Sequence, residues 1–162
     1  PVPPHHESLG HSLGILYRRR ERYFEEQLRP YGIGPGPYRL LMALYRRLGD
    51  RSAGRSVSQA EVGAWLGLDK AAVTRSMGKL EGQGYVARAR SAADGREYCI
   101  TLTDKAWGLK GEIAMVRGRW VSILERGFSA AERRQAVAYL RRMAGNADDF
   151  LERGGSDGRG EP

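Results

Sequence analysis

The sequence predicts a mainly α-helical fold with one small β-hairpin, an α+β arrangement. Apolar residues recur every three or four positions through most of the chain, the spacing of helices with one buried face. Two β-prone runs, at 85–90 and 96–102, flank a short turn at 91–95 that contains glycine. A chain of 162 residues can build one substantial core and is short for two independent domains. We therefore expect a single folded unit.

Both ends of the chain are expected to lie outside this unit. Residues 1–7 contain three of the seven prolines and no apolar periodicity, and residues 153–162 are rich in glycine and charge. Neither segment has enough apolar side chains to offset the entropy lost on ordering, so both are predicted to be disordered tails. The folded unit is expected to span residues 8–152.

Two helices are predicted in the first third of the chain. The first covers residues 9–28 and ends before Pro30 and Gly32. Its apolar stripe consists of Leu9, Leu13, Leu16, Tyr17, Phe24 and Leu28. The second begins near Pro35, because proline is well tolerated in a first turn, and ends at Gly49, where a left-handed cap is expected.

A tight helix-turn-helix follows. Ser58 and Glu61 have the spacing of a capping box, in which each side chain bonds to the other residue's backbone N–H, and Gly67 ends the helix that they open. Asp69 then caps the start of a second helix, which is expected to run to about Gln83. Only two residues separate these helices, so they must cross closely.

Two longer helices are predicted in the last third of the chain. One begins at Asp104 and carries the stripe Ala106, Leu109, Ile113, Val116, Trp120 and Ile123. The other opens with a second capping box at Ser129 and carries the stripe Val137, Leu140, Ala144, Ala147 and Leu151. Such stripes favour packing between helices of two chains. We expect residues 8–30 and 104–152 to form a dimerisation lobe, and residues 35–103 a second lobe.

The helix that follows Asp69 has two distinct faces. Val73, Met77 and Leu80 point one way, and the opposite face carries Lys70, Ala71, Thr74 and Arg75. Small residues and polar donors near a helix N-terminus suit insertion into the major groove of DNA. An ordinary solvated helix face is the alternative.

The hairpin carries a cluster of arginines. Arg88, Arg90 and Arg96 surround the turn, and Asp94 is placed to orient Arg96. Guanidinium groups on a narrow projection can bind phosphates or enter a minor groove, although a charged edge hairpin that resists aggregation has the same composition. The order of helix, turn, polar-faced helix and basic hairpin favours duplex DNA. The candidate DNA contacts are Ser58, Lys70, Ala71, Thr74, Arg75, Lys79, Arg88, Arg90, Asp94 and Arg96.

The amino-acid composition agrees with a DNA partner and argues against several other classes of protein. The 27 Lys and Arg residues exceed the 19 Asp and Glu residues, which leaves a formal charge of +8 and favours a polyanionic partner. No apolar run has the length of a membrane span or signal peptide, so we expect a cytoplasmic protein without a membrane partner. The lone Cys99 forms no internal disulfide, and is expected to be packed or idle.

Neither a metal, a cofactor nor a catalytic site is predicted. His5, His6 and His11 are the only histidines, and no carboxylate pattern completes a metal site around them. The sequence contains no nucleophile elbow, no phosphate-binding glycine loop and no metal-binding helix motif, so an enzyme is not expected.

From about Leu9 to Leu151 the chain resembles the MarR family of bacterial transcription regulators. The resemblance rests on residues 60–88 with their Leu-Glu-x-x-Gly exit, on Asp94-Gly95-Arg96 with the following Leu-Thr, and on the closing helix after Ser129. It implies a winged helix-turn-helix lobe, a homodimer, repression of nearby genes and, in many members, relief by a small molecule. Ala106 and Gly63 depart from the usual family residues without touching the proposed DNA surface.

An effector site is the least constrained expectation. Arg20 falls on the apolar stripe of the first helix, so it either pairs with a carboxylate or binds an anionic effector. With the family resemblance, this makes Tyr17, Arg20, Tyr38 and Met42 the candidate ligand residues for a small aromatic or anionic molecule. A winged-helix module that binds proteins rather than DNA is the alternative function.

Overall fold

The structure, a computed structural model, describes residues 8–49, 51, 56–67, 69–90 and 98–153. These residues form two compact units that divide between Trp120 and Val121. The predicted tails at 1–7 and 154–162 lie outside the described residues, while Arg153 caps the last helix. This division falls inside a helix, α5 (Asp104–Leu124). The predicted boundary at residues 103 and 104, which separates a dimerisation lobe from a second lobe, stays a prediction.

The helices of the first unit begin and end at the local signals of the sequence. They are α1 (Leu9–Leu28), the short 3-10 turn η2 (Arg29–Tyr31), α2 (Pro35–Leu48), α3 (Gln59–Leu66), α4 (Lys70–Gly82) and most of α5 (Asp104–Leu124). The Asp69 side chain accepts a hydrogen bond from the Ala72 backbone at 2.7 Å and caps α4. Gly49 ends α2 with a positive φ of 76° but not in the left-handed helical conformation that was expected, since its ψ is −100°.

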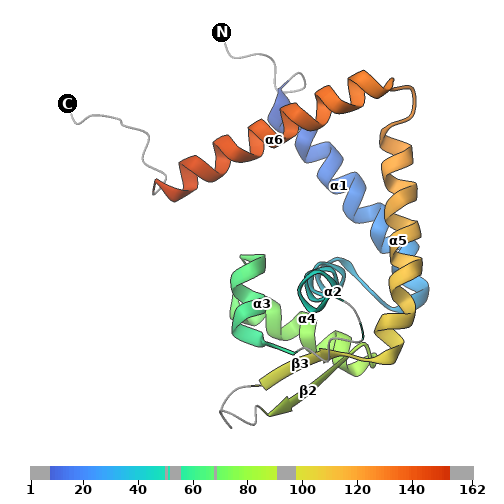
Figure 1. Cartoon of the computed structure of the whole chain (residues 1–162), viewed down its shortest axis with the longest axis vertical. Coiled ribbons are helices and arrows are strands. Elements are labelled where there is room, and N and C mark those ends of the chain that lie inside the picture. Colours follow the sequence, from blue (N-terminus) through green and yellow to red (C-terminus); the bar gives the residue numbers. More distant parts are fainter. Residues whose placement is uncertain (1–7, 50, 52–55, 68, 91–97, 154–162) are drawn as a thin grey trace, which may run out of the picture. The chain divides into compact units, whose positions relative to one another are not determined.

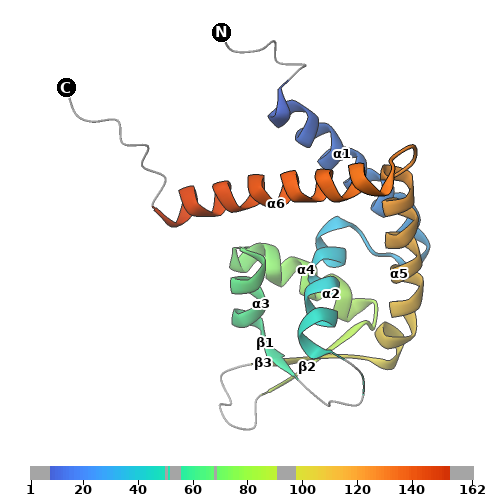
Figure 2. The same ribbon diagram turned by 45° about the horizontal axis from the view of Figure 1, so that its top comes forward.

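The predicted hairpin is present and belongs to a three-stranded antiparallel sheet. Strands β2 (Val86–Arg90) and β3 (Tyr98–Leu102) form the hairpin, and β1 (Val57–Ser58) pairs with the other edge of β3, giving the order β1-β3-β2 (Figure 2). The sequence predicts no strand at β1. Two residues are too short for an alternating pattern, and β1 exists because Val57 lies opposite Ile100.

Helix α2 forms the centre of the core in the first unit (Figure 1). Its Leu40, Leu41 and Leu44 are fully buried. The Tyr45 hydroxyl donates to the backbone carbonyl of Ala106, which joins α2 to α5. The Tyr23 hydroxyl likewise donates to the Val116 carbonyl at 3.1 Å and joins α1 to α5. The winged part of the chain is thus attached to the start of the long helix α5.

Only the C-terminal half of the predicted α1 stripe is buried. Phe24 and Leu28 are 4% and 0% exposed, whereas Leu9, Leu13 and Leu16 are 41–64% exposed. The apolar residues at the start of α1 therefore remain available for another surface.

The second unit contains the end of α5 and helix α6 (Ala130–Glu152). Its predicted capping box is present, because Ser129 and Glu132 bond reciprocally at 2.8 and 3.2 Å. No residue of α6 is buried, and Val137, Leu140 and Leu151 are 45–71% exposed. Among the described residues, no helix combines the length and apolarity needed to cross a bilayer.

Candidate nucleic-acid interface

The two faces of α4 are separated as expected. Val73, Met77 and Leu80 are at most 1% exposed and anchor the helix on the core. Lys70, Ala71, Thr74 and Arg75 are exposed on the other side. Close packing with α2 holds the buried face, since a Cβ on Gly36 of α2 would lie 2.9 Å from Ser76 Oγ of α4. The outer face of α4 is therefore a rigidly supported polar surface.

Helix α3 contacts this surface through a hydrogen bond that sequence reasoning missed. The Gln59 side-chain nitrogen Nε2 donates to Thr74 Oγ1 over 2.8 Å. Ser58, a predicted DNA contact, caps α3 by accepting a hydrogen bond from the Glu61 backbone at 3.2 Å. Ser58 and Gln59 lie together at the start of α3, next to the face of α4 that was expected to read DNA.

The two described arginines of the hairpin have different surroundings. Arg88 forms an ion pair with Glu81 at the end of α4, and these side chains are 29% and 36% exposed. Hydrogen bonding to Glu81 raises the pKa of Arg88 above its ordinary value. Arg90 is exposed at the end of β2. The guanidinium carbons of both arginines lie near the Tyr98 ring centroid, at 5.8 Å for Arg88 and 5.6 Å for Arg90. Arg90 thus lies nearer the turn, while Arg88 ties β2 to α4.

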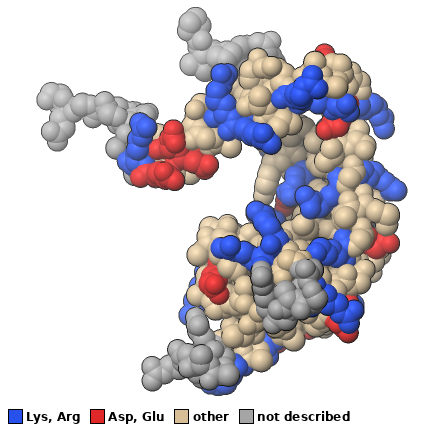
Figure 3. All heavy atoms as spheres, viewed as in Figure 1, with Lys and Arg blue, Asp and Glu red and all other residues tan. Residues whose placement is uncertain are grey.

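The remaining predicted contacts divide into two groups. Lys79 is exposed in the last turn of α4. Asp94 and Arg96 lie outside the described residues, so the expected pairing between them remains a prediction. Lys and Arg side chains appear on the drawn face of each unit (Figure 3), in keeping with the formal charge of +8.

The four candidate effector residues are not all brought together. Arg20 bonds to Glu21 at 2.7 Å and lies over the rings of Phe24 and Tyr38, at 5.1 and 6.0 Å. Of the two alternatives, the structure realises pairing with a carboxylate. Tyr38 is buried, and burial raises the pKa of its hydroxyl, whereas Tyr17 is 51% exposed.

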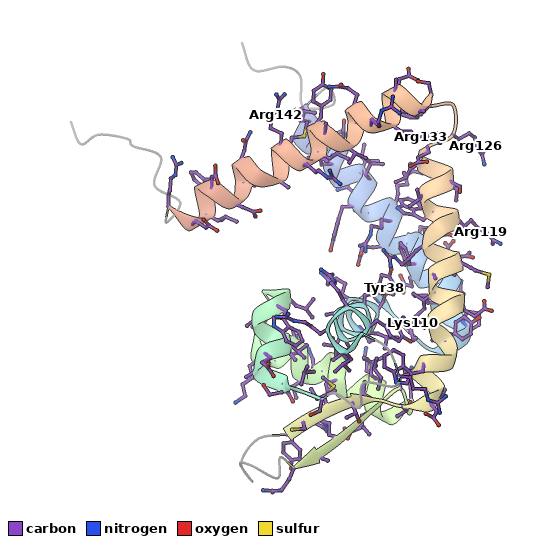
Figure 4. The ribbon with its side chains drawn as sticks, in the orientation of Figure 1. Tyr38, Lys110, Arg119, Arg126, Arg133 and Arg142 are labelled. Carbon is purple, nitrogen blue, oxygen red and sulfur yellow. The ribbon has the colours of Figure 1, made fainter. Side chains whose placement is uncertain are left out.

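Met42 instead lines a hollow between α2 and α5. The hollow has a volume of about 440 Å³, with Met42, Ile113 and Ala114 among its apolar residues and Arg46, Lys110 and Arg117 as its cations. Lys110 projects from α5 toward α2 and donates to the Gly49 carbonyl at 2.8 Å (Figure 4). Its ammonium also lies 5.1 Å from the Trp107 ring centroid. An apolar floor with cations around it suits a small anionic molecule.

Neither His11 nor Cys99 belongs to a metal-binding group among the described residues, and His5 and His6 lie outside those residues. His11 is exposed on α1, and Cys99 is half-buried in β3 opposite Ala89. Within the described ranges, no three histidine, cysteine or acidic side chains are grouped to hold a metal ion.

The architecture defines a winged helix-turn-helix protein: α3 and α4 form the helix-turn-helix, and β2 and β3 form the wing. Comparisons with known proteins identify the family. A model described as MarR family matches residues 31–97. The HTH-type transcriptional regulator TtmR of Methylorubrum extorquens is 34% identical over 149 residues, which cover 92% of this chain and 67% of that protein.

Solved structures of the family have the same fold. A MarR transcriptional regulator from Methanosarcina mazei superimposes with a TM-score of 0.76 at 31% identity, covering 88% of this chain and 97% of that one. A mutant MarR from E. coli complexed with operator DNA has a TM-score of 0.70 at 20% identity, covering 83% of this chain and 92% of that one. The chain belongs to the MarR family of transcription regulators, and it is a regulator rather than an enzyme.

Proposed function

We propose that the protein is a sequence-specific repressor that binds a pseudo-palindromic operator as a homodimer. The observation that carries this proposal is the exposed face of α4, where Lys70, Ala71, Thr74 and Arg75 surround the helix N-terminus. The small side chain allows close approach to base edges, and the other three supply donors. The E. coli relative that was crystallised with operator DNA has the same fold, which supports the assignment.

Within this proposal the helix and the wing have separate roles. Thr74 and Arg75 lie in the first two turns of α4, where a recognition helix contacts base edges. Arg90 lies on the wing beside the turn, where a guanidinium reaches phosphates or the minor groove. Helix α4 would then select the base sequence of the operator, and the wing would increase the affinity for duplex DNA of any sequence.

The exposed apolar residues of α1 and α6 support a homodimer. Two stripes are exposed among the described residues: Leu9, Leu13 and Leu16 in the first unit, and Val137, Leu140 and Leu151 in the second. A second copy would cover such stripes with an identical surface. Two recognition helices about one helical turn of DNA apart, roughly 34 Å, would then meet an inverted repeat.

A small anionic effector is proposed to act through the hollow between α2 and α5. Arg46, Lys110 and Arg117 offer cations there, while Met42 and Ile113 offer apolar contacts. A ligand at this position weakens DNA binding only if it prefers the conformation in which the recognition helices are wrongly spaced. Occupancy of promoter DNA in the cytoplasm would block transcription, and effector binding would relieve the block.

Gel-shift titration of promoter-derived duplexes at several salt concentrations tests the DNA-binding proposal. We expect a specific shift whose affinity falls with salt, because Lys and Arg displace counterions from phosphates. Arg75→Ala should weaken operator binding by about 1–3 kcal/mol and relax preference at one base position. Arg119→Ala is the matched control, since Arg119 is an exposed arginine that points outward from α5 (Figure 4).

Two results would contradict the assignment. The absence of any salt-dependent shift would favour the alternative of a winged-helix module for protein contacts. Equal losses for Arg75→Ala and Arg119→Ala would mean that net charge, rather than the face of α4, accounts for the binding.

A further inference from the structure

The start of α3 is joined to the exposed face of α4 by a side-chain hydrogen bond. Gln59 is the first residue of α3, and its amide nitrogen donates to Thr74 Oγ1 at 2.8 Å. Thr74 is exposed on α4, on the surface that the proposed function places against DNA. Gln59 therefore touches a residue of the reading face without being part of α4.

This hydrogen bond determines which way the threonine hydroxyl can act. A hydroxyl has one proton to donate and two lone pairs to accept with. The Gln59 amide group occupies one lone pair, so the proton of Thr74 must point elsewhere. Helical threonines often donate to the carbonyl one turn earlier, but no hydrogen bond donated by Thr74 occurs within the described part of the chain. The proton is therefore available to a group outside the protein.

We propose that Gln59 is a positioning residue that occupies one lone pair of Thr74 and turns its proton toward DNA, so that an acceptor is favoured on the base facing Thr74. In the major groove, guanine presents the acceptors N7 and O6, thymine presents O4, and adenine presents N7 beside its N6 amino donor, whereas cytosine presents only its N4 amino donor. The operator base facing Thr74 is therefore guanine, thymine or adenine in preference to cytosine. This inference rests on the proposed DNA-binding function and adds the chemical specificity of one position.

The test begins with selection of duplexes by the unaltered protein from a randomised library. Enriched sequences establish DNA binding and define the preferred base at each position. The absence of enrichment would overturn the proposed function itself, and with it this inference. Enrichment leaves the proposed function standing whatever the variants then show.

Three variants examine the hydrogen bond directly. Thr74→Val keeps the shape of the side chain and removes the hydroxyl, and Gln59→Met keeps the length and removes the amide. Gln59→Glu supplies an acceptor at neutral pH, so it reverses the bond and draws the Thr74 proton away from DNA. Glu at the first position of a helix is favoured by the helix dipole, so this variant is expected to fold.

We expect Thr74→Val and Gln59→Glu to lose the same single-position preference, by about two- to tenfold, and to keep the preferences elsewhere. Gln59→Met should reduce that preference less, because it frees the hydroxyl without reversing it. Ala64→Glu is the charge control, since it adds the same charge to another exposed position of α3. It should weaken binding to all sequences without changing any preference.

Three results would overturn the inference. Preference for cytosine at the position affected by Thr74→Val would mean that Thr74 accepts rather than donates. A uniform loss over all sequences in Thr74→Val would place the hydroxyl on a phosphate. If Gln59→Glu has the same base preferences as the charge control Ala64→Glu, Gln59 does not orient Thr74. Circular dichroism of each variant confirms that it is folded.

Discussion

At the residue scale, Arg88 and Arg90 show how two similar arginines acquire different roles. They stand two positions apart on β2, and both were expected to contact DNA. Arg88 is bonded to Glu81, and Arg90 is exposed beside Tyr98. Because alternate residues of a strand share a face, they lie on the same side of the wing and differ only in distance from the core. One ties the wing to α4, and the other remains at the surface.

Replacing each arginine by methionine should separate these roles. Arg88→Met should lower stability by about 1 kcal/mol, because Glu81 loses its charged partner in a partly buried place. In a chain of this size that corresponds to roughly 2–4 °C in Tm. Arg90→Met should weaken operator and random duplexes alike and reduce the salt slope by about one counterion. Thermal scans measure the change in Tm, and salt titrations measure DNA affinity and its salt slope. The assignment of separate roles would be contradicted if Arg88→Met left the Tm unchanged and Arg90→Met left DNA binding unchanged.

Ser58 has a structural role in addition to its predicted contact with DNA. Its side chain caps α3, so Ser58→Ala should cost about 1 kcal/mol of stability. Ser58→Asp keeps the cap and adds a negative charge beside the expected phosphates. If Ser58 lies at the DNA backbone, the aspartate variant should melt like the parent protein and bind DNA more weakly. Equal DNA affinity at moderate salt would limit Ser58 to capping.

At the scale of elements, the N-terminus of α6 contains a titratable cap. Hydrogen bonds from the side chain and backbone of Ser129 lower the pKa of Glu132. A lowered pKa in the folded state means that the stabilisation is present above the ordinary pKa of glutamate and is lost as pH falls through the folded value. Acidification should therefore loosen the first turn of α6.

Amide hydrogen exchange in the first turn of α6 measures this loss. Exchange at residues 131–133, corrected for the intrinsic effect of pH, should increase as the pH falls through the folded pKa of Glu132. Glu132→Gln should remove most of that dependence, because an amide does not titrate in this range. Glu152→Gln, at the other end of the same helix, is the control and should leave the first turn unaffected. The same pH dependence in Glu132→Gln would contradict the role of the cap.

At the scale of the whole molecule, the exposed apolar stripes bear on the oligomeric state. Leu140 is 50% exposed in the middle of α6, in a unit with no buried residue in that helix. Leu140→Glu should convert a dimer into monomers at micromolar concentration, because it places a charge in the centre of the proposed interface. Sedimentation measures the change. Ala138→Glu, which adds the same charge away from the stripe, should remain dimeric.

Loss of the dimer should also weaken operator binding, since two half-sites are then bound independently. A monomer in sedimentation of the unaltered protein would contradict the dimer proposal. The recognition surface of α4 lies in the first unit, so its contacts with a single half-site would still be testable.

The sequence by itself determined the α-helices and the hairpin of this protein and the two faces of α4. Caps at Ser58, Asp69 and Ser129, and the break at Gly67, involve hydrogen bonds and backbone angles within a few residues. The burial of Val73, Met77 and Leu80 follows from helical spacing alone. These features could be predicted because their causes are local.

Only the tertiary structure decided which side chains meet. Gln59 and Thr74 are 15 positions apart, Arg88 meets Glu81 across the end of α4, and β1 exists only through its pairing with β3. Burial of half the α1 stripe likewise depends on what packs against it. Such contacts join segments whose distance and orientation no local pattern specifies, because packing of the whole core sets them. For this reason the sequence indicated a DNA-reading helix, while the structure revealed the hydrogen bond between Gln59 and Thr74.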